Sequence, residues 1–587
     1  MTLTDIVQEL QTERGLSAGS IKLLEDRGFE EPEYARLNEI LQIGRQTFSE
    51  SRTTNWVQKE IELGDALEIT EGRYHSLVER FHDISSEQAL VQGRMKFAVE
   101  YVIALSDELV NQIPVNALVR RKFTDDEKLT LRSIYKTFSV QDYLAVKLIE
   151  RKTDHDVVSA NTWATIRAQQ LGFDESLMRR IVHFARTSDD VNANVTGNLY
   201  MKAIAEWTST VSDLLRALID KAKKHRNVTC IAETHGQPAQ LDALEHIYAN
   251  LAMQLVKHLE PLVSPHLFML EGKIAGATGT DVDMKAAFPQ LKTFDLYHEI
   301  ITHVFGLGHY ELGMDQSSTY AKFSQFLDVM TNVGLVMQKA ATDVWLYASN
   351  GMLAKANPKG VSGSSAMPQK INPYFAEGAE AALAIAEGMT LPIKRMLVAY
   401  RTQGDLRRSF TLREAFHPVM LSIIGMKRLT KELERYEPDI IGIETAIYQQ
   451  GPKIASSAVQ SYLRAHGVED AYDGLKDIVM KPVVKPSEVI DYVDGLVRDK
   501  RIDRRVGDSV KDMLFSVMDM DGNLDYLLKG TSFIDAVIHK MHKGNADVEH
   551  RKHLLGNAIS QTEEVIDSIT TNTRQALQRY RDIYQLD

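Results

Sequence analysis

Gly363-Ser364-Ser365-Ala366-Met367-Pro368-Gln369-Lys370-Ile371-Asn372-Pro373 is the stretch that decides how this sequence is interpreted. Its glycine and small hydroxyl residues follow neither a helical nor a strand period, which indicates a loop rich in backbone donors. The residues that follow, 374–383, have a helical pattern. A loop that leads into a helix N-terminus suits an anionic ligand, and Lys370 adds a positive charge there. On composition alone, however, an ordinary Gly/Ser-rich surface loop explains the stretch at least as well.

The order of the residues in this stretch carries more information than its composition. Gly-Ser-Ser-x-Met-Pro-x-Lys-x-Asn-Pro resembles the signature of the fumarase/aspartase superfamily, whose members are lyases that release fumarate by β-elimination. The resemblance implies an all-α, three-domain fold with a long central helical bundle. It also implies a homotetramer with 222 symmetry, active sites built from segments of three subunits, and no cofactor.

Composition and charge are those of a large folded protein. The chain has 587 residues, 44% of them hydrophobic, and is too long for one compact core. Its net charge of -12 argues against binding to nucleic acid or to an anionic membrane surface. The single cysteine, Cys230, can form no intrachain disulfide and is interpreted as a buried small hydrophobe. With no signal-peptide pattern and no apolar run of membrane length, we expect a cytoplasmic protein.

A period near 3.6 residues runs through most of the sequence and predicts helices. Five long apolar-periodic segments predict a helical bundle, and their apolar character predicts that subunits also pack together. These segments are residues 192–224, 241–262, 320–347, 377–393 and 418–433. The predicted divisions are an N-terminal helical extension (1–70), an N-terminal helical domain (71–190), the central bundle (191–445, with the loop 360–373), a C-terminal helical domain (446–540) and a C-terminal helical extension (541–587).

The motif Thr-His-Gly-Gln-Pro-Ala-Gln at residues 234–240 is a second candidate for chemistry. We predict that His235 lies on a loop before a helix that begins at Leu241, so that its imidazole projects from the end of the bundle. Such a histidine suits proton transfer. Taken alone, however, such a histidine is more often a capping or hydrogen-bonding residue.

Two further polar motifs have both a functional and a structural interpretation. His155 lies between two aspartates, but no Cys or His follows at a zinc-like spacing, so we expect no metal site. Thr187 and Ser188 precede Asp189 and Asp190, a pattern typical of a helix N-cap with acidic residues in the first turn. The same two hydroxyls could instead contact a ligand.

Taken in chain order, several blocks resemble the adenylosuccinate lyase family, and most closely its bacterial purine-biosynthesis form. The resemblance covers residues from about 70 to 540. Its blocks are Gly72-Arg73-Tyr74, His155-Asp156-Val157, His183-Phe184-Ala185, Thr187-Ser188, Thr234-His235-Gly236-Gln237-Pro238-Ala239, Gln316, Asp343-Val344-Trp345, the 363–373 loop, and Asp405-Leu406 with Ser409 and Arg413.

This resemblance implies roles for individual residues. Ser364 would be the general base that removes a Cβ proton of the succinyl group, and His235 the general acid that protonates the departing N6 of AMP. His155 would contact the substrate and orient the acid, and Asp156 and Ser365 would also bind substrate. The other implied contacts are Thr187, Ser188, Gln316, Lys370 and Asn372 for the succinyl carboxylates, and Arg73, Tyr74, Ser409 and Arg413 for the AMP phosphate.

The sequence departs from the family pattern at two positions. Gly404 stands where the family usually has an arginine, and Arg401, Arg407 or Arg408 could substitute for it. Ala275 replaces an asparagine that often follows the lysine of the glycine-rich segment. The first departure keeps open a lyase that releases fumarate from another substrate, such as argininosuccinate. A catalytically inactive helical scaffold is the remaining alternative.

Overall fold

The computed structural model describes residues 22, 24–26, 72–110, 118–226, 228–263, 269–308, 314–355, 367 and 370–517. Ser364 and Ser365 lie outside these residues. So do the predicted extensions at 1–70 and 541–587, except for residues 22 and 24–26.

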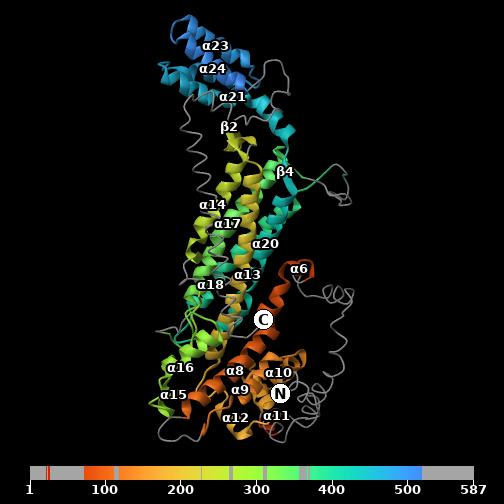
Figure 1. Cartoon of the computed structure of the whole chain (residues 1–587), viewed down its shortest axis with the longest axis vertical. Coiled ribbons are helices and arrows are strands. Elements are labelled where there is room, and N and C mark those ends of the chain that lie inside the picture. The colour runs from red at the N-terminus through yellow and green to blue at the C-terminus, as the bar shows by residue number, and fades with distance from the viewer. Residues whose placement is uncertain are drawn as a thin grey trace.

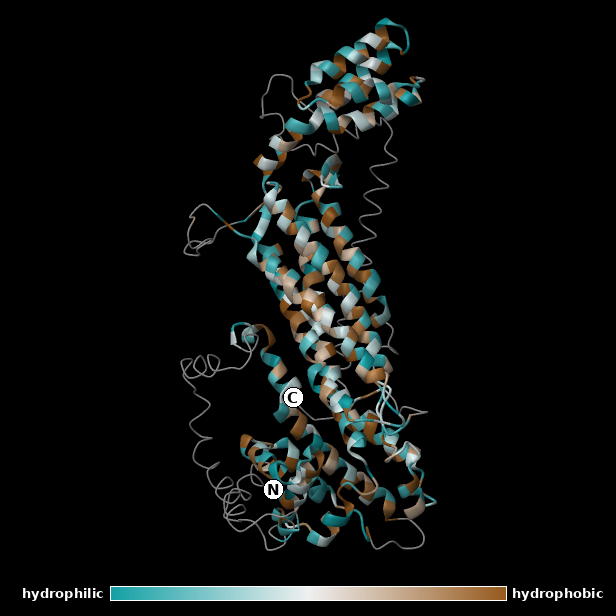
Figure 2. Cartoon of the chain, turned by 180° about the vertical axis from the view of Figure 1, so that it is seen from behind, coloured by the Kyte–Doolittle hydropathy of each residue, from teal (hydrophilic) through white to brown (hydrophobic). Residues whose placement is uncertain are grey.

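Five long helices run side by side and form the central bundle (Figure 1). They are α13 (Ser188–Lys224), α14 (Leu244–Val263), α17 (Ala321–Ser349), α18 (Tyr374–Val398) and α20 (His417–Arg435). Helix α18 packs against α17 and α20, and α13 packs against α14 and α20. Their buried sides hold residues at helical spacing, such as Trp207, Val211 and Leu214 of α13, and Figure 2 shows hydrophobic residues recurring along the bundle helices. The predicted all-α fold with a long central helical bundle is confirmed for the described residues.

The helix predicted to begin at Leu241 begins instead at Leu244, because a β-hairpin precedes it. Strand β1 (Thr229–Thr234) pairs antiparallel with β2 (Gln237–Ala243), and Ile231 lies opposite Leu241. His235 and Gly236 form the two-residue turn with φ of 57° and 69°. Positive φ at both turn residues matches the right-handed twist of a short hairpin, which keeps Leu241 in a strand.

Shorter helices precede the bundle in the chain, and most of them lie below it in Figure 1, whereas the first of them lies beside α20. Helix α8 is the longest of them and is buried along most of its length. Ser139 caps α10, and its capping box with Asp142 shows why that helix begins there. The elements are α6 (His75–Val78), the 3-10 helix η2 (Glu79–Phe81), α7 (His82–Ser85), α8 (Glu87–Leu109), α9 (Asp125–Lys136), α10 (Val140–Thr153), α11 (Asp156–Gln170) and α12 (Glu175–Ile181).

Short elements connect the bundle helices. They are α15 (Val282–Ala287), α16 (Thr293–Glu299), the π-helix η3 (Ile300–Val304), β3 (Leu353–Lys355), α19 (Arg407–Glu414) and β4 (Tyr436–Pro438). Strands β3 and β4 pair antiparallel, with Lys355 opposite Tyr436. This pairing places Lys355, which precedes the 360–373 loop in the chain, beside the end of α20.

The last described helices form a second core at the top of Figure 1. They are α21 (Ile440–Ala465), α22 (Ala471–Val479), α23 (Pro486–Arg498) and α24 (Arg504–Val517). The predicted limit between the central bundle and the C-terminal domain, at residues 445 and 446, falls inside helix α21, which is continuous there. The predicted domain limits stay a prediction. Among the described helices, none combines the length and the apolar character needed to cross a bilayer.

Candidate active site

One end of the bundle carries two arginines around one carboxylate. Asp156 begins α11, Arg94 lies in α8 and Arg413 in α19. Asp156 Oδ2 accepts hydrogen bonds from Arg94 Nη2 at 2.6 Å and Arg413 Nη2 at 2.8 Å, and Oδ1 accepts one from the backbone N–H of Val157 at 2.7 Å. Burial raises the pKa of Asp156, but the charge of Arg94 and these hydrogen bonds outweigh it and lower the pKa. The ionised carboxylate therefore positions two guanidinium groups, rather than standing free for substrate.

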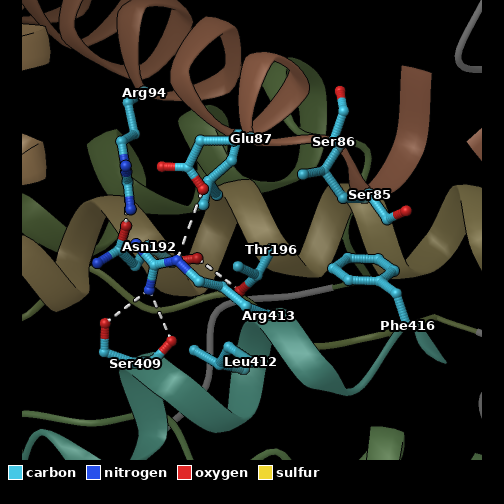
Figure 3. Close-up of a pocket in the computed structure, with 12 residues that line it drawn as sticks. Ser85, Ser86, Glu87, Arg94, Asn192, Thr196, Ser409, Leu412, Arg413 and Phe416 are labelled. Atoms are coloured by element: carbon cyan, nitrogen blue, oxygen red, sulfur yellow. Dashed lines mark hydrogen bonds and ion pairs between the residues drawn. The ribbon is translucent and has the colours of Figure 1, made fainter. Parts of the chain in front are cut away.

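These arginines border a pocket of about 510 Å³, counted with its opening to solvent (Figure 3). Arg413 Nη1 donates to the carbonyl and hydroxyl oxygens of Ser409 at 2.7 and 2.9 Å, and its Nε lies 3.6 Å from Glu87 Oε2. Arg94 Nε donates to Asn192 Oδ1 at 3.0 Å. Arg94 Nη1 is buried and has no hydrogen-bond partner among the described residues. A buried cationic donor beside a pocket suits an anionic ligand.

The pocket contains two predicted residues and several that the sequence reasoning missed. Ser409 and Arg413 were predicted, whereas Glu87, Arg94 and Asn192 were not. One signal was available for Arg94, since it is a single arginine among buried residues of a helix. The full lining is Ser85, Ser86, Glu87, Leu90, Arg94, Asn192, Thr196, Leu199, Ser409, Leu412, Arg413 and Phe416.

Thr187 and Ser188 open helix α13, so the N-cap interpretation of their motif is confirmed. The backbone N–H of Thr187 donates to Asp190 Oδ2 at 3.0 Å. Gln316 Nε2 donates to Thr187 Oγ1 at 3.4 Å. The structure therefore brings together three predicted carboxylate-binding residues, about one helical turn before the Asn192 that lines the pocket.

The glycine-rich segment that contains Lys273 donates hydrogen bonds to the first turn of α13. Asp190 is fully buried and accepts hydrogen bonds from Lys273 Nζ at 2.6 Å and from the backbone N–H groups of Ala275 and Gly276 at 2.8 and 3.0 Å. Burial raises the pKa of Asp190, but the charges of Lys273 and Arg186 outweigh it and lower the pKa. Ala275 contributes a backbone donor, which any residue except proline supplies, so its side chain is not required for this contact.

Two histidines lie in this region, His155 beside the arginine cluster and His183 near Arg186 and Asp190. His155 caps α11, and its Nδ1 accepts from the backbone N–H of Val158 at 3.5 Å and lies 3.4 Å from Asp156 Oδ1. His183 has a left-handed backbone with φ of 63°. Burial, with the nearby charges of Arg186 and His155, lowers the pKa of His183 to about 4 against the attraction of Asp190. His183 is therefore neutral near pH 7. The sequence analysis named it only within the block His183-Phe184-Ala185 and predicted no role for it.

A second group of predicted residues lies at the other end of α18, around Lys355. Its Nζ donates to the carbonyl of Asn372 at 3.1 Å and lies 3.4 Å from Glu432 Oε2. The side chains of Lys355 and Glu432 are almost completely buried. The same Nζ lies 4.7 Å from the ring centroid of Tyr374. Lys355, which precedes the signature stretch in the chain, thus contacts the C-terminal end of that stretch. Of the residues predicted within it, Asn372 is partly buried and Lys370 exposed.

Tyr74 belongs to this second group and not to the pocket. Its ring lies 5.5 Å from the guanidinium carbon of Arg428 on α20, and Arg73 beside it is exposed. Position 428 is eleven residues beyond the start of α20 at His417. This corresponds to about 16 Å along the helix. Within one chain, Arg73 and Tyr74 therefore do not meet Ser409 and Arg413.

His235 forms a third location, at the tip of the β1–β2 hairpin, where it is exposed. The hairpin lies at the upper end of the bundle in Figure 1. Cys230 in β1 is fully buried, and burial, with the charge of Asp242, raises the pKa of its thiol to about 12. This agrees with the prediction that Cys230 is a buried small hydrophobe. No group of three His, Cys, Asp or Glu side chains in the described part of the chain is arranged to hold a metal ion.

The pocket lies far from the other two locations within one chain. Helix α13, which separates Ser188 from the hairpin of His235, has 37 residues and therefore a length of about 55 Å. Helix α18, which separates Asn372 from Ser409, has 25 residues and a length of about 37 Å. A single chain cannot bring these side chains to one substrate.

Comparison with known proteins gives the family. A family model described as lyase matches residues 72–386, which is more than half of the chain. The chain belongs to this lyase family. Curated relatives include the adenylosuccinate lyase of Dictyostelium discoideum, 26% identical over 464 residues that cover 76% of this chain and 94% of the relative. That of Escherichia coli (strain K12) is 24% identical over 436 residues, covering 73% of this chain and 92% of the relative.

Solved structures support the same fold. A fumarate lyase from Mesorhizobium sp. BNC1 superposes with a TM-score of 0.57 at 13% identity, covering 83% of this lyase and 97% of that chain. A 3-carboxy-cis,cis-muconate lactonizing enzyme from Pseudomonas putida gives a TM-score of 0.58 at 15% identity, covering 84% and 98%. The chain is an enzyme of the lyase class with the helical fold of these proteins.

The structure explains part of the departure at Gly404 of this lyase. A Cβ atom at Gly404 would lie 2.6 Å from Gln316 Oε1 and 3.1 Å from Ser317 Oγ, so an arginine there would displace Gln316. Of the arginines that could substitute, Arg407 is paired with Asp405 at 2.6 Å near the surface. Arg408 is buried, donates to the carbonyl of Ser318 at 2.6 Å and stacks on Tyr400 at 3.8 Å. Arg408 is therefore the one that lies in the protein interior beside the segment of Gln316.

Proposed function

We propose that this lyase cleaves adenylosuccinate to AMP and fumarate by acid/base β-elimination, and that it also cleaves the related succinyl-carboxamide ribotide. The observation that carries the proposal is the preformed anion site in which Asp156 holds Arg94 and Arg413 beside Ser409 and the pocket. Such paired guanidinium groups suit a substrate with a phosphate and two carboxylates. Curated relatives named adenylosuccinate lyase, of which more than nine tenths is covered, support the same substrate.

The mechanism assigns the chemistry to the predicted residues. Ser364 removes a proton from Cβ of the succinyl group, and the C–N bond breaks as His235 protonates the departing N6 of AMP. Thr187, Ser188, Gln316, Lys370 and Asn372 hold the carboxylates while negative charge develops on the carbon. Ser409 and Arg413, with Arg73 and Tyr74, hold the phosphate. A serine becomes a sufficient base only where water is excluded and nearby cations and N–H groups stabilise its alkoxide.

An absorbance assay with adenylosuccinate and argininosuccinate in parallel tests this function. We expect turnover of adenylosuccinate, and at most trace turnover of argininosuccinate, because the aromatic and aliphatic pocket residues Phe416, Leu412 and Leu199 offer an apolar wall that a purine can cover. The second candidate function is a lyase that releases fumarate from argininosuccinate. Gly404 favours it, because a glycine stands where the family usually has an arginine. Turnover of argininosuccinate alone would replace the proposal by that candidate, and no turnover of either would favour an inactive scaffold.

We infer that the active form is a homotetramer whose sites combine segments of different subunits. The separation of Ser409 from His235 and from Asn372 along the bundle supports this, since neighbouring copies of the bundle packed in opposite directions would bring opposite ends together. The outer faces of α17 and α18 also expose large apolar side chains, as expected of helices that pack against another copy. These include Leu335, Trp345, Leu346, Ile385, Leu391 and Val398.

Mixing two inactive variants tests the shared site. His235→Gln and Ser364→Ala subunits, unfolded and refolded together, are expected to regain activity at about a quarter of their sites, because random assembly pairs an intact His235 with an intact Ser364 from another chain in that proportion. The measurement is kcat per subunit of the mixture against each variant refolded alone. Activity no higher than that of the separate variants would place both residues of a site in one chain.

The proposed compartment is the cytoplasm. A single buried thiol and an excess of acidic residues suit a reducing environment without nucleic-acid or membrane partners. The proposed partners are therefore the small-molecule substrate and other copies of the chain.

A further inference from the structure

We propose that Arg428 is a further substrate-binding residue, which holds the nucleotide phosphate together with Arg73 and Tyr74. The inference rests on the proposed function. It concerns the second location, around the end of the signature stretch, and not the pocket of Arg413. No motif in the sequence pointed to Arg428, because it lies within a regular helix.

The guanidinium of Arg428 is held between two aromatic rings. Its carbon Cζ lies 5.5 Å from the ring centroid of Tyr74 and 5.1 Å from that of Phe375. Nη2 donates to the carbonyl of Tyr374 at 2.8 Å. Stacking and one backbone contact fix the plane of the group, so its remaining N–H groups point in defined directions.

One of these remaining donors has no protein partner among the described residues. Nε of Arg428 is buried and makes no hydrogen bond within the described residues. No carboxylate of the described residues forms an ion pair with Arg428 either. The nearby Glu432 lies instead 3.4 Å from Lys355. An arginine with a partly buried charge and no carboxylate partner is typical of sites that bind an anion.

Gly378 on the facing helix α18 leaves the space that the guanidinium occupies. A Cβ atom at Gly378 would lie 2.5 Å from both Cζ and Nε of Arg428, and closer still to Nη2. Gly378 has no left-handed backbone that would demand glycine, because its φ is helical. A glycine inside a helix costs stability relative to alanine. Its presence here is explained by the room it gives to Arg428.

The neighbouring residues indicate which part of the substrate Arg428 would hold. Tyr74 is its stacking partner, and the resemblance assigns Arg73 and Tyr74 to the phosphate end. A planar guanidinium beside a phenol offers bidentate hydrogen bonds to a phosphate dianion. AMP carries this phosphate and fumarate does not, so the two products report separately on the two ends of the site.

Titration calorimetry of AMP and of fumarate on the full-length protein tests the inference. We expect Arg428→Met to weaken AMP binding by about 10- to 100-fold, the loss typical of a hydrogen bond to a charged group. Fumarate binding should stay within about threefold, since the phosphate contact is remote from its carboxylates. Arg428→Lys should restore part of the affinity, because it keeps the charge but loses the planar fork. Gly378→Ala should resemble Arg428→Met, because the new methyl group displaces the guanidinium.

Lys431→Met is the matched control. Lys431 lies one turn farther along α20, is exposed, and lies 5.0 Å from the ring of the same Phe375. Its loss removes an equal charge without touching Tyr74 or Tyr374, so AMP affinity should change less than about threefold. Thermal unfolding and the oligomeric state of each variant show that the fold is retained.

Three outcomes would overturn the inference. AMP affinity in folded Arg428→Met and Gly378→Ala no weaker than in Lys431→Met would reduce Arg428 to a structural link between α18 and α20. A selective loss of fumarate binding would assign it to a carboxylate instead. A wild-type protein that neither binds AMP nor cleaves adenylosuccinate would overturn the proposed function as well, whereas the first two outcomes leave that function standing.

Discussion

Replacement of His235 by glutamine is expected to lower kcat by about 10² to 10⁴, the contribution typical of a positioned general acid. The leaving nitrogen departs poorly without a proton, and a neutral amide cannot supply one. KM should change little, because His235 acts on the transition state and not on the phosphate or carboxylates. Steady-state kinetics with adenylosuccinate measures both parameters.

The hairpin geometry supplies the control for this variant. His235 has a left-handed φ of 57°, a conformation that asparagine tolerates better than most residues. His235→Asn should therefore keep the turn and show the same loss of kcat as His235→Gln. Because the side chain is exposed at the hairpin tip, the thermal midpoint of both variants should stay near that of the wild type. Near-full activity in both would move the acid role to His155, which already lies beside the arginine cluster.

Replacement of Ser364 by alanine is expected to abolish turnover while substrate affinity stays largely intact. The general base is removed, but the carboxylates and the phosphate are held by other groups. The described residues nearby make a serine base plausible. Lys370 brings a cation to the loop, and the buried Lys355 holds the C-terminal end of the loop through the carbonyl of Asn372 and pairs with the buried Glu432. Affinity of the inactive variant is measured directly by calorimetry with adenylosuccinate.

Ser365→Ala is the matched comparison. A serine that only donates hydrogen bonds to the substrate contributes to the ground state and the transition state alike, so its loss should raise KM and lower kcat more evenly. Mild and similar effects from both variants would mean that the serines only shape a Gly-rich loop. An active Ser364→Ala enzyme would refute the assignment of the base.

The sequence by itself determined the elements whose signal is local. Helical periodicity predicted the five bundle helices, because burial of one helix face repeats every 3.6 residues wherever the chain folds. The acidic pair after Thr187 and Ser188 predicted a helix start, since a cap needs only residues within one turn. The motif order that resembles adenylosuccinate lyase also named Ser409 and Arg413, which the structure places together.

Only the tertiary structure decided how distant side chains meet. The hairpin at 229–243 overrode the expected helix start at Leu241, because its turn depends on two left-handed residues whose strands must pair with each other. Arg94 reaches Asp156 across 62 positions, and Arg428 occupies the space above Gly378 across 50. No periodicity records such contacts. The helix lengths that separate His235 from Ser188 support the proposal that the site is shared between subunits, because the rise per residue of a rigid helix cannot be shortened.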